Sequence, residues 1–156
     1  VEQVGKRDDV FLRPKSKKVA QFLGVKNIYR AKVLKNEESS QRLILGVNGL
    51  LFSIPINLYQ GKIEVGKEVD LFIRPEEVMI LREDKPVKDS LKRNVFEGEV
   101  LDMTDKERYH LVYFQTTEGR IPFEISIPNY TFRNLNLSIG NKVRIALREE
   151  SLWMMT

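Results

Sequence analysis

The side chains of this sequence that could act on a ligand are hydrogen-bond donors and cations rather than nucleophiles. Cysteine is absent from the 156 residues and His110 is the one histidine. The sequence therefore lacks a thiolate nucleophile and has almost none of the residues needed for a His-rich or Cys-based metal site or a Ser-His-Asp triad. No glycine-rich loop ending in Lys-Ser or Lys-Thr is present to hold a nucleotide phosphate. The excess of positive charge could mean attraction to nucleic acid, to anionic lipid or to small anions. If the partner is an anion, several convergent donors are needed, because desolvating a dianion is costly.

Candidate donors fall at matching positions of two segments. Lys26 and Asn27 open the first segment as Arg93 and Asn94 open the second, and each segment closes on an arginine. A tetrahedral oxyanion is held by cationic side chains, hydroxyls and amide groups acting together. The candidate oxyanion-binding residues, which owe this role to the family resemblance given below, are Arg93, Asn94, Ser126, Thr131 and Arg148, with Lys26, Asn27 and Arg74 in the first segment.

The same residues have a purely structural interpretation. The two asparagines are suited to cap the start of a strand, and Arg74 and Arg148 have acidic neighbours with which to form surface ion pairs of little energetic weight. These neighbours are Glu76, Glu77, Glu149 and Glu150. For His110, a solvent-facing or hydrogen-bonded strand position is favoured over a catalytic one. The sequence leaves both interpretations of the donors open.

The positions match because the second half of the chain repeats the first. Residues 26–33 align with 93–100, where a basic residue, Asn, an aliphatic residue, an aromatic residue and a final Val coincide. Residues 65–74 likewise align with 139–148. A repeat of this length predicts two copies of one structural unit, each with too small a core to stand alone, so we expect the copies to pack together or on a second chain.

Within each copy the pattern predicts five short strands. Alternating or short apolar runs lie at residues 28–34, 42–47, 50–54, 69–73 and 78–81, and again at 95–103, 109–116, 120–125, 142–147 and 152–155. Asn48-Gly49 is typical of a two-residue hairpin turn, and Thr117-Glu118-Gly119 makes the matching turn. In the second copy, Thr131–Leu135 predicts one helical turn with Thr131 as its N-cap.

These elements predict an all-β fold of two OB-like barrels in tandem. The first barrel is expected at 25–83 and the second at 93–156, with a polar linker at 84–92. Residues 1–24 read as short helices that form a tether, because Val19, Phe22 and Leu23 share one helical face and Gly24 is placed to end the helix.

The overall composition sets the expected location. Net charge is +4 and the isoelectric point is about 9.3. No apolar run approaches the roughly 18 residues of a membrane span, and no signal peptide is recognisable. With no cysteine, a reducing cytoplasmic location is expected.

Several segments resemble a known family. Gln3–Gly5, Asp9–Pro14 and Val19–Gly24 resemble the segment that leaves the nucleotide-binding domain of sugar- and oxyanion-type ABC importers. Asn27 and the block Ile73–Val78 resemble the accessory barrel of those ATPases, the TOBE or MOP domain. The resemblance covers essentially the whole chain and implies that ATP, magnesium and catalysis belong to a missing ATPase domain, so that this fragment itself is no enzyme and holds no cofactor.

Within that family the second copy is similar to molybdate- and tungstate-binding MOP domains. Ser90–Val100 is similar to their Ser-x-Arg-Asn opening, Thr131–Leu137 to the stretch after their oxyanion-contacting loop, and Arg148 takes the place of a lysine in the last strand. Two positions depart from the pattern. Ser90 lies one residue further from the arginine, and Pro128 stands where a hydroxyl residue is usual, which leaves Ser126 as the nearby hydroxyl.

The resemblance therefore implies a regulatory and dimerisation domain of an ABC-transporter ATP-binding protein that senses cytoplasmic molybdate or tungstate. Its partners would be its own ATPase domain, a second ATPase subunit, permease subunits at the inner face of the membrane, and the oxyanion. The alternative is a purely structural dimerisation domain of an importer for another solute, such as sugar or sulfate. Nucleic-acid binding, which OB-like barrels often perform, ranks below both because most aromatic residues fall at alternating strand positions that suit a core.

Overall fold

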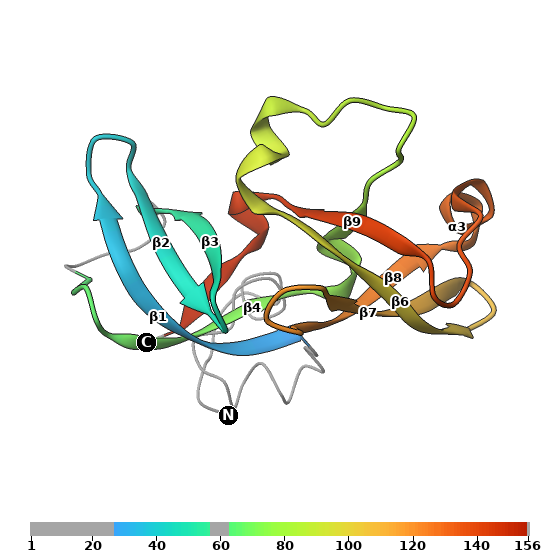
Figure 1. The fold of residues 1–156 in the computed structure, drawn as a ribbon, viewed down its shortest axis with the longest axis horizontal. Coiled ribbons are helices and arrows are strands. Elements are labelled where there is room, and N and C mark those ends of the chain that lie inside the picture. The colour runs from blue at the N-terminus through green and yellow to red at the C-terminus, as the bar shows by residue number, and fades with distance from the viewer. Residues whose placement is uncertain (1–26, 57–62, 156) are drawn as a thin grey trace, which may run out of the picture.

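The structure, a computed structural model, describes residues 27–56 and 63–155, which form two five-stranded antiparallel sheets (Figure 1). The first half contributes β1 (Asn27–Glu37), β2 (Arg42–Val47), β3 (Leu50–Pro55), β4 (Glu68–Ile73) and β5 (Val78–Ile80). The second half contributes β6 (Val95–Asp105), β7 (Tyr109–Thr116), β8 (Pro122–Pro128), β9 (Lys142–Leu147) and β10 (Trp153–Met155). Every expected strand is present, and the predicted all-β fold is confirmed. The expected helical tether and Lys26 lie outside the described residues.

The two hairpin turns differ in length. In the first half Val47 pairs with Leu50, and both Asn48 and Gly49 have positive φ, at 47° and 87°, as a type I′ turn requires. In the second half β8 begins at Pro122 rather than at residue 120, because Gly119 and Arg120 also take positive φ and extend the turn. The two turns meet, since the Asn48 side-chain amide donates to the carbonyl of Gly119 at 3.3 Å.

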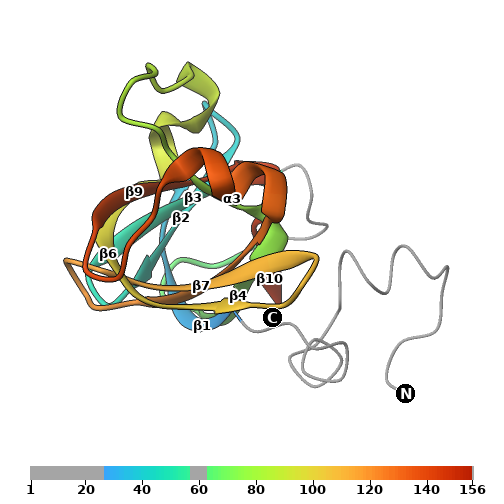
Figure 2. The same cartoon turned by 90° about the vertical axis from the view of Figure 1, so that its right-hand side faces the viewer.

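The last strand of each half belongs to the sheet of the other half. The first sheet has the order β10-β4-β1-β2-β3 and the second has β5-β9-β6-β7-β8. Trp153 therefore pairs with Phe72, and Val78 pairs with Leu147. Figure 2 shows β10 beside β4 close to the C-terminus. Both exchanged strands are three residues long and follow a 3₁₀ turn, η2 (Pro75–Glu77) or η4 (Glu149–Ser151), that redirects the chain.

One core serves both halves. A single cluster of buried apolar side chains draws on both sheets. Two aromatic pairs cross between the halves, Phe52 with Phe96 at a ring-centroid distance of 4.7 Å and Tyr29 with Phe123 at 5.2 Å. Phe52 and Phe123 stand at equivalent positions of the repeat, and so do Tyr29 and Phe96. The two pairs are therefore equivalent, and an approximate two-fold rotation relates the halves.

Tyr29 makes the stability of this shared core sensitive to alkali. Its hydroxyl donates to the carbonyl of Pro122 in the other half, and burial raises the pKa of Tyr29 above its ordinary value of 10.0. Above about pH 10 the unfolded chain loses this proton while the folded chain keeps it, so the free energy of unfolding falls by up to about 1.4 kcal/mol per pH unit.

We therefore expect Tyr29→Phe to make the loss of stability between pH 10 and 11 shallower than in the parent chain, measured by urea unfolding across that range. At neutral pH the variant loses one hydrogen bond, at a cost of about 1 kcal/mol. Tyr130→Phe is the control, because Tyr130 is 76% exposed. Equal alkaline slopes for Tyr29→Phe and the parent would contradict the prediction.

The helix in the second half begins earlier than expected. α3 spans Asn129–Leu135, with Pro128 at its N-cap, so the prediction of Thr131 as N-cap is wrong. The reason is Asn129, whose side-chain oxygen lies 2.8 Å from Nδ1 of His110 on β7 and whose amide donates to the carbonyl of Glu107. His110 also stacks on Phe132 at 3.8 Å. His110 is thus a hydrogen-bonded strand residue, as expected.

Across residues 27–56 and 63–155, no helix is long and apolar enough to cross a membrane. The same ranges hold no group of His, Cys, Asp and Glu side chains suited to a metal ion.

Candidate functional site

The repeated asparagines lie at the boundary between the halves, and each binds the backbone of the opposite half. Asn94, the last residue of the 3₁₀ helix η3 (Asp89–Asn94), donates from Nδ2 to the carbonyl of Ser53 at 2.9 Å and accepts from the Ser53 N–H at 2.8 Å. Asn27 does the same with Glu124, at 2.9 and 2.8 Å. Both asparagines are buried, at 0% and 2% exposure. Their amide groups therefore join the halves and leave one Nδ2 hydrogen each for any other partner.

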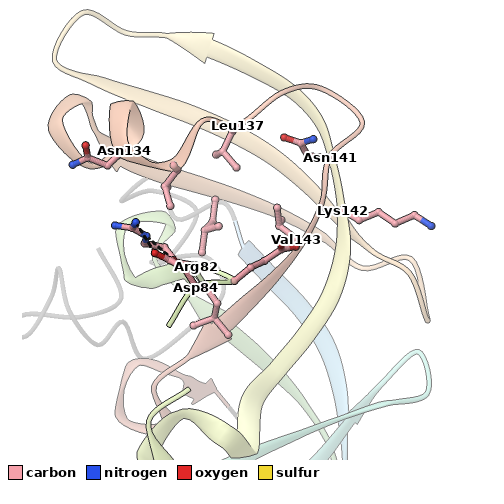
Figure 3. Close-up of a pocket in the computed structure, with 11 residues that line it drawn as sticks. Arg82, Asp84, Asn134, Leu137, Asn141, Lys142 and Val143 are labelled. Carbon is pink, nitrogen blue, oxygen red and sulfur yellow. Dashed lines mark hydrogen bonds and ion pairs between the residues drawn. The ribbon is translucent and has the colours of Figure 1, made fainter. Parts of the chain in front are cut away.

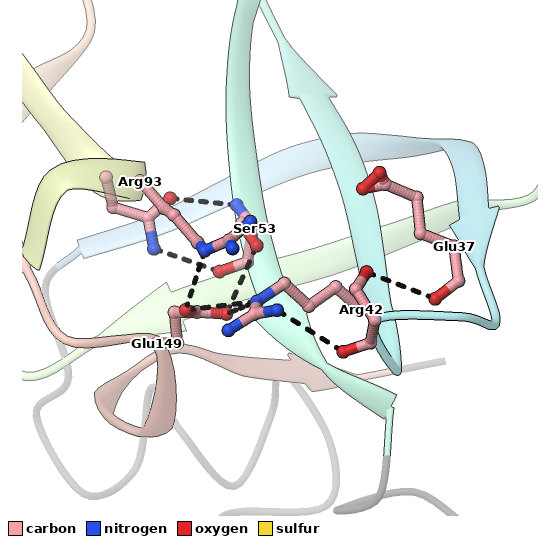
Figure 4. A network of polar contacts seen from close by, with 7 residues as sticks. Glu37, Arg42, Ser53, Arg93 and Glu149 are labelled. Atoms are coloured by element: carbon pink, nitrogen blue, oxygen red, sulfur yellow. Dashed lines mark hydrogen bonds and ion pairs between the residues drawn. The ribbon is translucent and has the colours of Figure 1, made fainter. Parts of the chain in front are cut away.

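Beside the Asn94 bridge, polar groups from both halves converge on the carboxylate of Glu149 in η4 (Figure 4). Nε of Arg42 donates to both carboxylate oxygens, at 2.9 and 3.2 Å, and Oγ of Ser53 donates at 3.2 Å. Nε of Arg93 lies 3.7 Å from the same group. We call Arg42, Ser53, Arg93 and Glu149 the Glu149 cluster.

The Glu149 cluster has the character of an anion site. Two guanidinium groups face one carboxylate, and the Glu149 side chain is only 13% exposed, whereas that of Arg93 is 48% exposed. Charge-assisted donors in a partly buried setting are the groups that hold carboxylates, phosphates and other oxyanions. The cluster thus holds an anion already, and that anion is part of the chain.

The two terminal arginines of the repeat lie differently. Arg74 is 29% exposed, and its Nε contacts a carboxylate oxygen of Glu76. Arg148 is exposed at the start of η4, directly before Glu149. Of the ion pairs considered from sequence, Arg74 with Glu76 is present, while Glu149 pairs with arginines that are distant in sequence.

The remaining predicted residues do not join the Glu149 cluster. Ser126 is half-buried on β8 opposite Leu111, two residues along the strand from the Asn27 bridge at Glu124. Thr131 is exposed on α3. Of the predicted residues, the structure thus brings Arg93 and Asn94 together near Ser53. Arg148 directly precedes Glu149 in the chain, and Ser126 and Thr131 lie elsewhere in the second half.

A pocket of about 370 Å³ lies elsewhere, between β9, the segment after β5 and the segment around α3 (Figure 3). Arg82, one of the cations in its lining, is paired with Asp84 through contacts of 3.0 and 3.1 Å. Glu83 adds a further negative charge to the lining. Lys142 is a second cation of the lining. Because Arg82 is paired with Asp84 and none of the candidate residues lines the pocket, it is a weaker candidate for an anion site than the Glu149 cluster.

Sequence reasoning missed Arg42 and Ser53, and it treated Glu149 only as a surface ion-pair partner. Arg42 and Ser53 are 107 and 96 residues from Glu149 in the chain, so no local pattern connects them. The repeat carried a usable signal. The strand register places Leu111 at the repeat position of Arg42. A charged residue in one copy that is aligned with an apolar residue in the other marks a position whose side chain the fold does not require.

Comparison with known proteins gives relatives of one kind. No protein-family model matches the chain. The molybdate/tungstate import ATP-binding protein WtpC of Pyrococcus horikoshii is 40% identical over 150 residues, which are 96% of this chain and 38% of that protein. WtpC of Thermococcus kodakarensis is 41% identical over 98 residues, which are 63% of this chain and 24% of that protein. The chain therefore spans well under half the length of these relatives.

Among solved structures, the cytoplasmic molybdate-binding protein ModG, in a form with molybdate bound, is similar in fold. The TM-score is 0.69 at 14% identity, over 85% of this chain and 96% of that one. This likeness concerns the fold and supports the OB-like architecture. Together with the curated relatives it confirms the resemblance stated from the sequence: the chain is homologous, over nearly its whole length, to part of the molybdate/tungstate import ATP-binding proteins.

Proposed function

We propose that this chain is the C-terminal regulatory region of an ABC-importer ATP-binding protein and that it binds a cytoplasmic tetrahedral oxyanion, molybdate or tungstate. ATP hydrolysis belongs to the ATPase domain of the parent protein, which would work as a pair of subunits with permease subunits at the inner face of the membrane. The oxyanion, rather than a metal or nucleotide, would be the ligand of this region.

One observation carries the proposal. Arg93 and Asn94, which the sequence singles out as donors, lie at the junction of the two halves together with Arg42 and Ser53. A ligand held there touches both halves at once, because Ser53 and Arg42 come from the first half and Arg93 from the second. Binding would favour one arrangement of the halves over others, which is the requirement for a regulatory ligand.

Thermal unfolding tests the proposal most directly. The chain is heated alone and with molybdate, tungstate, sulfate or phosphate at matched ionic strength. A ligand that binds only the folded state stabilises it by RT ln(1 + [L]/Kd), about 2.7 kcal/mol at 100 times Kd, and this raises Tm by several degrees. We expect that rise with molybdate and tungstate, and little or none with sulfate and phosphate.

A flat response to every anion would contradict oxyanion sensing. It would favour the second candidate, a dimerisation region without a ligand, which is supported by apolar side chains exposed at equivalent positions of both halves. Val65 is 61% and Ile139 is 63% exposed, and Leu34 and Leu101 are 44% and 46% exposed. Light scattering over a range of protein concentrations would then show a monomer–dimer equilibrium.

A further inference from the structure

The Glu149 carboxylate is held by the donors that the proposed function assigns to the oxyanion. Its two oxygens accept from Nε of Arg42 and Oγ of Ser53, and Nε of Arg93 is 3.7 Å away. We propose that Glu149 is an internal competitor for the oxyanion site, so that an oxyanion binds there by displacing this carboxylate. The inference rests on the proposed function and specifies how that site is regulated.

The repeat argues that this arrangement is not a requirement of the fold. The aligned strand registers place Pro75 at the repeat position of Glu149, Leu111 at that of Arg42, and Glu124 at that of Ser53. The other half therefore forms the same sheet, the same 3₁₀ turn and the same asparagine bridge without this ion pair. An ion pair that only one of two equivalent positions carries points to a role beyond stability.

The chemistry of the donors is consistent with exchange of one anion for another. The two guanidinium groups and the hydroxyl act as hydrogen-bond donors here, and any anion with suitably placed oxygens can accept from them. A tetrahedral dianion has four acceptor oxygens, whereas the carboxylate has two. The carboxylate, being tethered, competes at a high effective concentration and so weakens apparent affinity. It also repels any dianion that enters while it is still in place.

Displacement would also change what joins the halves. Glu149 links η4, which leads into the exchanged strand β10, to β2 and β3 of the first half. When an oxyanion takes its place, the hydrogen bonds and ion pairs of Glu149 to the first half are released, and the ligand becomes the bridge. The internal carboxylate thereby sets the oxyanion concentration at which the junction changes.

The test is isothermal titration of tungstate into the folded chain at pH 7.5 and into three variants. Glu149→Gln keeps the size of the side chain and removes its charge. Glu149→Pro installs the residue of the other half at a first-turn position where proline is well tolerated. Glu150→Gln is the matched control, since it makes the same change in net charge at an exposed neighbour.

We expect both Glu149 variants to bind tungstate at least tenfold more tightly than the parent chain, and Glu150→Gln to bind within twofold of it. Tight binding by the Glu149 variants with none by the parent would also support the competitor role, while contradicting oxyanion sensing by the parent. Parent binding that neither Glu149 variant strengthens would overturn the inference and leave the proposed function standing. If neither the parent nor any variant binds, both are overturned.

Discussion

Asn94→Asp is expected to lower the free energy of unfolding by about 3–5 kcal/mol, because it places a buried acceptor against another acceptor and adds an unpaired buried charge. In the native chain Nδ2 donates to the Ser53 carbonyl at 2.9 Å, and the Asn94 side chain has 0% exposure. An aspartate oxygen at the same place faces that carbonyl with no hydrogen between them. The new charge also lies near the carboxylate of Glu149, which Ser53 contacts.

Denaturation in urea at pH 7.5 measures this effect. Asn27→Asp makes the same change at the equivalent bridge, and we expect a somewhat smaller loss because Glu124, its partner, is only half-buried. Asn134→Asp, at an exposed position of α3, is the control and should stay within about 0.5 kcal/mol of the parent. A loss below about 1 kcal/mol for Asn94→Asp would mean that the bridge is not a main link between the halves.

Removing residues 153–156 is expected to destabilise the first half of the chain, although the cut lies at the end of the second. The deletion takes away β10, which pairs with β4 through Phe72, Leu71 and Asp70. Met154 and Met155 are each 3% exposed, and burial of two such side chains contributes about 3–6 kcal/mol before other losses are counted. We expect a loss of at least about 4 kcal/mol, or failure to fold at 37 °C.

Hydrogen exchange distinguishes this prediction from simple loss of a C-terminal strand. In the truncated chain, amide protection should fall first in β4 and its neighbour β1, while β9 and β6 keep more of theirs. Met79→Gly in β5 is the reciprocal variant. It weakens the strand that pairs with β9, and its loss of protection should centre on the second sheet. Earlier loss in β9 than in β4 after the truncation would contradict the exchanged topology.

Most of the secondary structure could be predicted from the sequence because its causes are local. The turn at Asn48-Gly49 requires positive φ, and the alternation in residues 42–47 matches the buried and half-buried alternation of β2. The exchange of β5 and β10 could not be predicted. These strands have only three residues each, and their apolar patterns suit either sheet, so the choice depends on the direction in which η2 and η4 turn the chain.

The candidate site was predictable only in part for a related reason. Arg93 and Asn94 stand out because they recur in the repeat, but recurrence reports what the fold needs in both halves. Asn94 indeed serves the junction. The features that distinguish the halves, Arg42 and Glu149, are invisible to a search for similarity and emerge only from the differences between copies, once the strand register shows which positions correspond.

The exchanged strands give this single polypeptide the topology of a domain-swapped dimer whose two chains have been joined end to end. In a dimer of identical chains, any substitution appears at both symmetry-related positions, so a change that suits one is imposed on the other. Joining the copies removes that constraint. One position can then carry Glu149 while its counterpart carries Pro75, so that two equivalent positions of one fold have different roles in the same chain.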